Sequence, residues 1–538
     1  MIGLVAPTAR AFCREATGTP APGYDPTTQG CFGPNLMPLY WKNLCVGYSL
    51  QRDASPLRGI SIDQATAVAA QAFATWSATA CSGGGMPSVT AVDNGPVDCD
   101  LVQYNKDQPN QHVIVFRDAG WPYDDSSNVL GLTTLTYDVT DGEIFDADME
   151  INSNQYNLVA GGPASPGSYD LPSVLTHEAG HFLGLAHSAD DTAVMYALYR
   201  PGTVTLMPDD IAGICTIDPP DGTRSAAAGV LASTACDPTP RHGFSTQCAA
   251  DVDAGDGSPA SGGDGGANGS GDGAPSGQHP ASHAKACSVT AAGATQEMCG
   301  PVPLGILATV GFFLRRARRR VRTMRSIAAA TALGLATLGA CTLATRDARA
   351  SVSIAVLFGE LVRDSSGIAI VTPVEQRAAW EGGRIYTYTR VDVETLVAGT
   401  LPAEVWVQTM GGVVGDIGQI VEGEAVLTLG QRSLLFLHQP TTPPAAKPAV
   451  AVGAMFRVTA RAQGQFPVVL GEDKKPRFVA ATGLGALLPP PPERIARIAQ
   501  ADPTGNGQRF ARDALHGRAV QEAAPDIAAT WWRLNATK

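Results

Sequence analysis

Hydrophobic positions recur at helical spacing in some stretches of this chain and at alternating or continuous spacing in others. Residues 61–80 place apolar side chains on one helical face, with Ser61 positioned to cap the first turn. Helical spacing also covers residues 172–186 and begins again at residue 209. Short runs predict strands at residues 41–50, 89–92, 101–104, 112–116, 131–137 and 143–151. Long helices with short strands indicate an α+β domain, which we place at residues 12–222.

A second set of predicted strands occupies the C-terminal part of the chain. Residues 384–397 alternate between polar and apolar side chains after a Gly382-Gly383 turn signal. Further runs of strand length lie at residues 405–408, 425–429, 434–438 and 456–460. This pattern predicts a separate, mostly-β domain at residues 351–488, built as a β-sandwich or a barrel. A proline run then breaks the chain, and residues 489–538 are expected to form a loose helical tail.

The segment that joins these two regions lacks the apolar side chains that a folded domain needs. Residues 255–277 consist almost wholly of Gly, Asp, Ser, Ala and Pro. Such a composition cannot bury enough apolar surface to offset the entropy of ordering the chain. We therefore expect a disordered Gly/Asp/Ser-rich linker at residues 223–300.

Several segments indicate export of a bacterial type. Residues 1–11 end in Ala-Arg-Ala and resemble the end of a signal peptide. Residues 301–323, a short apolar span with an arginine cluster, resemble bacterial sorting tails of the MYXO-CTERM kind. Residues 324–350 contain the parts of a complete secretory signal, and Leu338–Cys341 resembles a lipobox, whose cysteine would be lipidated. Either two exported proteins are joined in one reading frame, or residues 301–344 form a membrane hairpin that anchors the protein.

Composition and cysteine content agree with a secreted or surface-anchored protein. The 538 residues carry a net charge of −12, which does not favour nucleic acid as a partner. The eleven cysteines fall into a set of six around the α+β domain's motifs, a set of four in the linker, and Cys341 alone. Even sets indicate disulfides and an oxidising compartment, although their connectivity cannot be deduced. No Cys-x-x-Cys pair occurs, which disfavours a structural zinc bound by cysteines. We expect a monomer.

Eleven consecutive residues, from His177 to His187, carry the chemistry and read His-Glu-Ala-Gly-His-Phe-Leu-Gly-Leu-Ala-His. Because residues four apart share a helix face, His177 and His181 can bind one metal ion, with Glu178 beside them. Gly184 accepts the left-handed backbone that ends a helix, so the chain can turn back and bring His187 to the same ion. Three protein ligands and an open fourth position are typical of a catalytic zinc site.

This pattern, H-E-x-x-H-x-x-G-x-x-H, resembles the signature of the metzincin metalloproteases. A chance match on a buried helix is the alternative, which we weigh at roughly one in fifty given how many positions the pattern requires. Met195 lies eight residues after His187, where metzincins have a methionine turn. The segment Met195–Tyr199 resembles the matrixin branch, except that Ala197 stands where matrixins have proline. Ser188 and residues 207–214 also resemble matrixins.

The resemblance covers about residues 35–218 and implies a metzincin fold, with a twisted mixed sheet and long helices. It implies one catalytic Zn²⁺ with ligands His177, His181 and His187, a general base Glu178, and a substrate pocket walled by Tyr196, Ala197 and Tyr199. The function it implies is a zinc-dependent endopeptidase that hydrolyses peptide bonds of extracellular proteins with a metal-activated water.

Other functions stay open at this point. The protein could be an exported zinc-binding surface or adhesion protein with incidental or latent protease activity. An aminopeptidase or another zinc hydrolase would account for the first two histidines but not for Gly184, His187 and Met195. The sequence around Cys13 does not match the cysteine motif that keeps animal matrixins latent, so latency would need another device. The C-terminal region is either an adhesive module or a domain that folds against the protease.

Asp146, Asp148 and Glu150 alternate along one predicted strand and therefore share one face. Three carboxylates on one face could bind Ca²⁺, and matrixins have an acidic calcium site in the equivalent region. A solvated polar face is the alternative, which we favour at roughly two to one because such alternation is common in half-exposed strands.

Overall fold

The computed structural model describes residues 12–18, 36–123, 129–161, 165, 167–188, 190–196, 201–248, 353–402, 404–440, 453–481, 487–488 and 490–535. The predicted signal remnant, sorting tail and internal signal segment lie outside these residues, so those assignments stay predictions. Among the described residues, no helix has the length and apolar character needed to cross a bilayer. We refer to residues 12–248 as the N-terminal region and to residues 353–535 as the C-terminal region.

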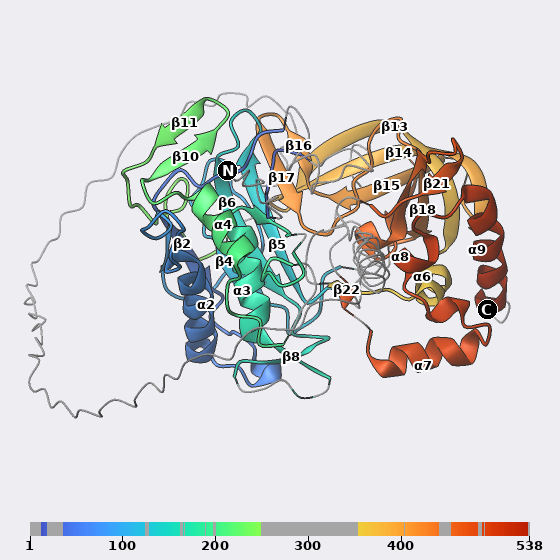
Figure 1. Ribbon diagram of the computed structural model, residues 1–538, viewed down its shortest axis with the longest axis horizontal. Helices are drawn as coiled ribbons and strands as arrows, with labels where there is room; N and C mark the ends of the chain where they lie inside the picture. Colours follow the sequence, from blue (N-terminus) through green and yellow to red (C-terminus); the bar gives the residue numbers. More distant parts are fainter. Residues whose placement is uncertain are drawn as a thin grey trace, which may run out of the picture. The chain divides into compact units, whose positions relative to one another are not determined.

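Five strands of the N-terminal region form a mixed sheet (Figure 1). In spatial order they are β3 (Thr90–Asp93), β2 (Cys45–Leu50), β4 (Val113–Phe116), β6 (Ile144–Ile151) and β5 (Gly131–Asp138). Neighbouring strands are parallel except for β5, which runs antiparallel to β6. Strands β3 and β5 are therefore the two outer strands that this region contributes to the sheet.

Two long helices pack against the sheet and against each other (Figure 1). Helix α2 (Ile62–Ser77) begins after Ser61, whose hydroxyl accepts a hydrogen bond from the Gln64 backbone N–H, which confirms the predicted cap. The Trp76 indole N–H on α2 donates to the carbonyl oxygen of Thr176 on α3 (Leu171–Phe182) at 2.8 Å. The shorter elements are β1 (Cys13–Arg14), η1 (Pro56–Arg58), β7 (Asn157–Val159), β8 (Ser168–Asp170), β9 (Leu185–Ala186) and α4 (Pro208–Ile217).

Three predicted elements of this region differ in the structure, and one of them, the strand predicted at residues 41–50, begins only at Cys45. Residues 101–104 do not form a strand, because their backbone groups find partners outside a ladder: Gln103 N–H donates to the Asp148 carboxylate and Tyr104 N–H to the Gly383 carbonyl. The helix predicted over residues 172–186 ends at Phe182.

Three disulfides among the described residues link parts of the N-terminal region that lie far apart in sequence. They are Cys45–Cys236, Cys81–Cys215 and Cys99–Cys248. Two of them connect the set of six cysteines to the set of four. Strands β10 (Thr223–Ala226) and β11 (Gly229–Ala232) form a hairpin just before Cys236. Residues 223–248 are thus part of the folded region, contrary to the expectation of a flexible linker from residue 223.

The core of the C-terminal region is a closed β-barrel, which is one of the two predicted architectures. Its strands are β13 (Gly367–Glu381), β14 (Arg384–Gly399), β15 (Glu404–Met410), β19 (Ala454–Val458) and β18 (Ser433–His438). The ring closes because β13 pairs with both β14 and β18. Strands β20 (Gln465–Leu470) and β21 (Pro476–Phe478) extend it, and the remaining short elements are β12 (Ser353–Ile354), β22 (Leu487–Leu488), η3 (Arg461–Gly464) and η4 (Asn506–Gln508).

The C-terminal helices pack on this barrel and are not the loose tail that was predicted. The helices of the predicted tail are α7 (Pro492–Ala501), α8 (Ala511–Leu515) and α9 (Val520–Asn535), and they pack together with α6 (Phe358–Asp364), which precedes the barrel strands. Ile527 and Leu534 of α9 belong to the same buried cluster as Phe358 of α6, and Arg494 forms an ion pair with Glu360 at 2.6 Å. The strand predicted at 425–429 is also wrong, because Val426 exchanges its backbone hydrogen bonds with the Gln465 side chain and not with a neighbouring strand.

One hairpin of the C-terminal region leaves the barrel and joins the sheet of the N-terminal region. It consists of β16 (Gly412–Val414) and β17 (Ile417–Val421). Strand β17 pairs antiparallel with β5, so the sheet has seven strands in the order β16-β17-β5-β6-β4-β2-β3. Figure 1 shows the orange hairpin beside β5. Of the two alternatives for the C-terminal region, this pairing favours a domain that folds against the N-terminal region.

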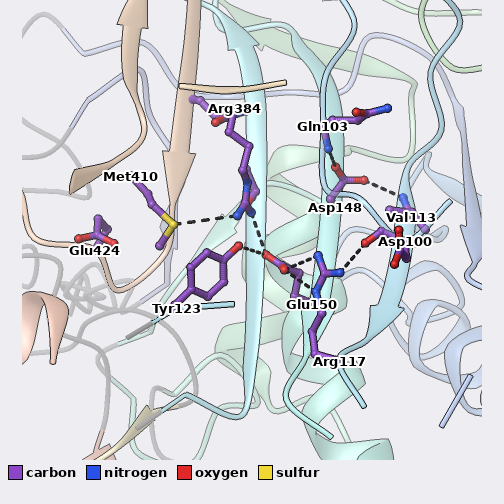
Figure 2. Close-up of polar contacts among 12 residues, drawn as sticks. Asp100, Gln103, Val113, Arg117, Tyr123, Asp148, Glu150, Arg384, Met410 and Glu424 are labelled. Atoms are coloured by element: carbon purple, nitrogen blue, oxygen red, sulfur yellow. Dashed lines mark hydrogen bonds and ion pairs between the residues drawn. The ribbon is translucent and has the colours of Figure 1, made fainter. Parts of the chain in front are cut away.

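A buried ion pair strengthens this contact. Figure 2 shows Arg384 at the start of β14 reaching Glu150 on β6, with the Arg117 guanidinium and the Tyr123 hydroxyl at the same carboxylate. The Arg384 Nη2 atom lies 2.8 Å from Glu150 Oε2 and 3.0 Å from the hydroxyl oxygen of Thr134. Burial lowers the pKa of Arg384 to about 10, so the guanidinium is still charged at neutral pH.

Replacing Arg384 by methionine is expected to destabilise the protein, because the buried Glu150 carboxylate loses one of its two cationic partners. We expect a loss of about 2–4 kcal/mol in the free energy of unfolding, measured from the first transition in urea. Arg432→Met is the control, since Arg432 and Glu394 form a half-exposed ion pair and its loss should cost under about 1 kcal/mol. Equal effects of the two substitutions would contradict the structural importance of the buried pair.

Candidate metal centre

The local sequence of α3 positions the first two histidines. The Asp170 carboxylate caps the helix by accepting the Ser173 N–H at 3.1 Å, and a proline follows in the first turn. The helix ends at Phe182, and Gly184 takes a left-handed conformation with φ +91°. This turn sends the chain into β9, which ends at Ala186 and delivers His187 back toward α3.

The structure brings the three predicted ligand atoms together. The Nε2 atoms of His177 and His187 are 2.6 Å apart, and Nε2 of His181 lies 3.1 Å and 2.8 Å from them. The Nδ1 atoms of His177 and His181 lie 2.8 Å from the carbonyl oxygens of Val194 and Leu185. Because a carbonyl only accepts, these Nδ1 atoms carry the protons and the Nε2 lone pairs face one another.

The electrostatics of this cluster suit a divalent cation. All three rings are at most 4% exposed, and burial lowers the pKa of His177 to about 4 and those of His181 and His187 well below the usual range. The imidazoles are therefore neutral, which is the state that binds metal. Three converging nitrogen lone pairs repel one another unless a cation lies among them, and three imidazoles are a common ligand set for catalytic zinc.

Glu178 follows His177 on α3, and only one of its two carboxylate oxygens accepts a hydrogen bond among the described residues. Its Oε2 accepts the Thr133 hydroxyl at 2.5 Å, whereas the buried Oε1 has no hydrogen bond among the described residues. A Cβ at Gly131, the first residue of β5, would lie 2.8 Å from this Oε1, so a glycine there makes room for the carboxylate. Burial raises the pKa of Glu178 to about 8, and a bound dication would oppose this by favouring the ionised form.

The predicted methionine turn packs under the helix. Met195 is buried, and its sulfur lies so close to Gly180 that a Cβ added to that glycine would be 2.2 Å from it. Asp210, in the first turn of α4, holds this segment by accepting the N–H groups of Val194 and Met195 at 2.7 and 2.9 Å. Since the Val194 carbonyl orients His177, Asp210 supports a ligand indirectly.

Asp210 and Thr133 are site residues that the sequence reasoning missed. Asp210 had a signal, because it lies at the third position of a helix that starts Pro-Asp-Asp, where a carboxylate can accept orphan N–H groups. No sequence signal pointed to Thr133, because a threonine that faces the interior is common on a strand. Of the predicted pocket residues, Tyr196 is half-buried, and Ala197 and Tyr199 lie outside the described residues.

The acidic strand face is buried, which corrects the favoured prediction of a solvated face. Asp146, Asp148 and Glu150 are at most 1% exposed. Backbone N–H groups of Gln103 and Val113 donate to the Asp148 carboxylate, as Figure 2 shows, while cations and a tyrosine surround Glu150. The calcium site stays a prediction that these contacts do not favour, because donors occupy oxygens that a calcium ion would need.

Residues 40–217 match the family model described as Matrixin. The chain is 41% identical to Metalloendoproteinase 1 of Glycine max over 100 residues, which are 18% of this chain and 30% of that protein. It is 52% identical to Metalloendoproteinase 1-MMP of Arabidopsis thaliana over 54 residues, 10% of this chain and 15% of that one. It is 27% identical to human Matrix metalloproteinase-20 over 179 residues, 32% of this chain and 31% of that protein. The chain thus spans less than a third of the length of these relatives.

Replacing Gly180 by alanine is expected to destabilise the protein, although alanine favours helices. The new Cβ would lie 2.2 Å from the Met195 sulfur and 2.8 Å from the Trp76 ring, and the ring cannot move aside easily. Overpacking costs about 1–3 kcal/mol, against about 1 kcal/mol gained in helix propensity. Thermal melting should show a lower midpoint for Gly180→Ala but not for Gly83→Ala, whose Cβ would meet nothing within 4 Å. A Gly180→Ala protein as stable as the wild type would contradict the packing described here.

Proposed function

We propose that the matrixin domain at residues 40–217 makes this protein a zinc-dependent endopeptidase that cleaves extracellular proteins. One observation carries the proposal: three neutral imidazole nitrogens converge, and Glu178, next to His177 in sequence, has a buried carboxylate oxygen without a hydrogen-bond partner among the described residues. His177, His181 and His187 would hold the zinc ion. When bound, the ion supplies a Lewis acid that polarises the scissile carbonyl and makes water acidic.

The side chains of this protein would then accept and donate the protons of the reaction. Oε1 of Glu178 is buried and has no hydrogen-bond partner among the described residues, so it can take a proton from the attacking water and pass it to the leaving amine nitrogen. Thr133 fixes the carboxylate by donating to Oε2, which leaves Oε1 as the reactive oxygen. The Val194 and Leu185 carbonyls hold the His177 and His181 rings in the tautomer whose Nε2 lone pair would bind the ion.

The proposed location is outside the cytoplasm, because the described residues contain three disulfides and such bonds persist in oxidising compartments. We propose protein or peptide substrates and no nucleic acid, and the pocket walls proposed for them are Tyr196, Ala197 and Tyr199. Anchoring through residues 301–344 and a monomeric state remain proposals from the sequence alone.

A latent protein that binds zinc and cleaves little is the second candidate. The covered edge of β5 favours it, since the C-terminal hairpin pairs with the strand that borders Glu178. The intact Glu178 and histidines favour an enzyme that can be released from this state.

Glu178→Gln should abolish cleavage while zinc stays bound. Loss of a general base lowers turnover about 10²–10⁴-fold, whereas all three ligands are kept. We would measure cleavage of a denatured protein with and without a chelator, together with zinc per chain, in the wild-type chain and in the Gly418→Val variant described below. The exposed Glu493→Gln is the control. Full activity of Glu178→Gln would refute the role of Glu178, and zinc-free wild-type chains would refute the metal centre.

A further inference from the structure

The outer edge of β5 is the natural place for an extended peptide to reach the metal centre. Strand β5 is one of the two edge strands of the N-terminal region's own sheet, so its outer backbone groups need partners from elsewhere. The strand begins at Gly131 against the Glu178 carboxylate and continues through Thr133, which holds that carboxylate. An extended peptide that adds to such an edge gains backbone hydrogen bonds and lies along a strand that borders the Glu178 carboxylate.

Strand β17 of the C-terminal region already occupies this edge. It pairs antiparallel with β5 from Ile417 opposite Asp138 to Val421 opposite Thr134. The chain therefore runs along the edge toward the metal centre. The next residue, Glu422, donates its N–H to the Thr133 carbonyl at 3.4 Å.

Glu422 ends this path beside the candidate ligands. Its side chain is buried and hydrogen-bonded to Glu15 from the start of the N-terminal region. Ligand atoms of Glu422, Glu15 and His181 lie within 4.8 Å of one another. Glu422 is also close enough to Glu178 for their charges to interact. A segment of the C-terminal region thus lies near both the proposed base and a proposed ligand.

Side-chain contacts also connect the C-terminal region to strands β5 and β6 of the N-terminal region. The Gln419 side chain donates to the Thr136 hydroxyl at 3.0 Å and accepts the Ile385 N–H at 2.9 Å, so it ties β5 to the barrel. Gly418 lies directly against the ring of Tyr137, where a Cβ would be 2.3 Å from Cζ. The buried pair between Arg384 and Glu150 adds a charged contact on the neighbouring strand.

We propose that the C-terminal region is an intramolecular inhibitor of the metal centre. Strand β17 takes the place of an extended polypeptide substrate along β5, and Glu422 lies at the end of this strand near Glu178 and His181. This inference rests on the proposed endopeptidase function. It implies that substrates bind as unfolded, extended segments, and that the full chain is latent until the hairpin leaves the edge.

Gly418→Val tests the proposal, because any side chain at this position collides with Tyr137 and should displace β17. Gly83→Val is the matched control, since a Cβ there meets nothing within 4 Å. Gln419→Ala is a second, milder variant that removes the bridge to Thr136 without adding bulk. All are made in the full chain, and zinc content is measured for each.

Three readouts are compared: amide hydrogen exchange of residues 131–138, affinity for a hydroxamate-capped extended peptide, and cleavage of a denatured protein. In Gly418→Val, we expect β5 to lose its protection from exchange, because β17 no longer covers it. The state with an open β5 edge is then no longer rare, so the probe should bind at least about tenfold more tightly and cleavage should be faster by a similar factor. Gln419→Ala should shift the same way by less, and Gly83→Val should match the wild type.

Unchanged probe affinity in Gly418→Val, with β5 unprotected and zinc bound, would overturn the proposal. Rapid exchange of β5 in the wild type would overturn it as well, since the edge would then be open. If Gly418→Val fails to fold, the same comparison is made with Gln419→Ala. Tighter probe binding without any cleavage would support the inhibitory hairpin and refute the endopeptidase function, so the two hypotheses fail separately.

Discussion

Three buried imidazole nitrogens, 2.6–3.1 Å apart, are the constraint on which the rest of the N-terminal region depends. Two of them come from one helix face, but the third requires the chain to stop the helix and reverse. Gly184 permits the reversal, and the Leu185 carbonyl in the returning strand orients His181. The methionine turn and Asp210 then support His177 from the other side. Neutral, buried rings whose nitrogen lone pairs converge form a site that a cation stabilises.

The second constraint is the outer edge of β5. A sheet edge beside a carboxylate can bind an extended peptide through backbone hydrogen bonds. When it is left open, it can also pair with other chains and aggregate. In this chain the C-terminal barrel supplies the missing strand, and the Arg384–Glu150 pair holds the barrel to the sheet in a buried setting. The same contacts therefore join the two regions and cover the route to the metal centre. Under the proposed inhibition, one interface both joins the two regions and controls activity.

Local patterns allowed much of the N-terminal region to be predicted from the sequence. The cap of α2, the spacing of the three histidines and the glycine turn are all local features, and the structure has them where they were expected. Contacts over long sequence distances could not be predicted. Glu150 and Arg384 are 234 residues apart, and no pattern near either residue reveals the other. Strict alternation in β6 also looks the same whether its acidic face meets water or, as here, partners from two regions.

X-ray absorption spectroscopy of the zinc-loaded full chain tests the metal centre most directly. The three-histidine site predicts only nitrogen and oxygen neighbours at about 2.0–2.1 Å, with the scattering pattern of three imidazoles, one of which is lost in His187→Ala. Sulfur neighbours, or a spectrum that His187→Ala leaves unchanged, would show that zinc binds elsewhere and would contradict the centre described here.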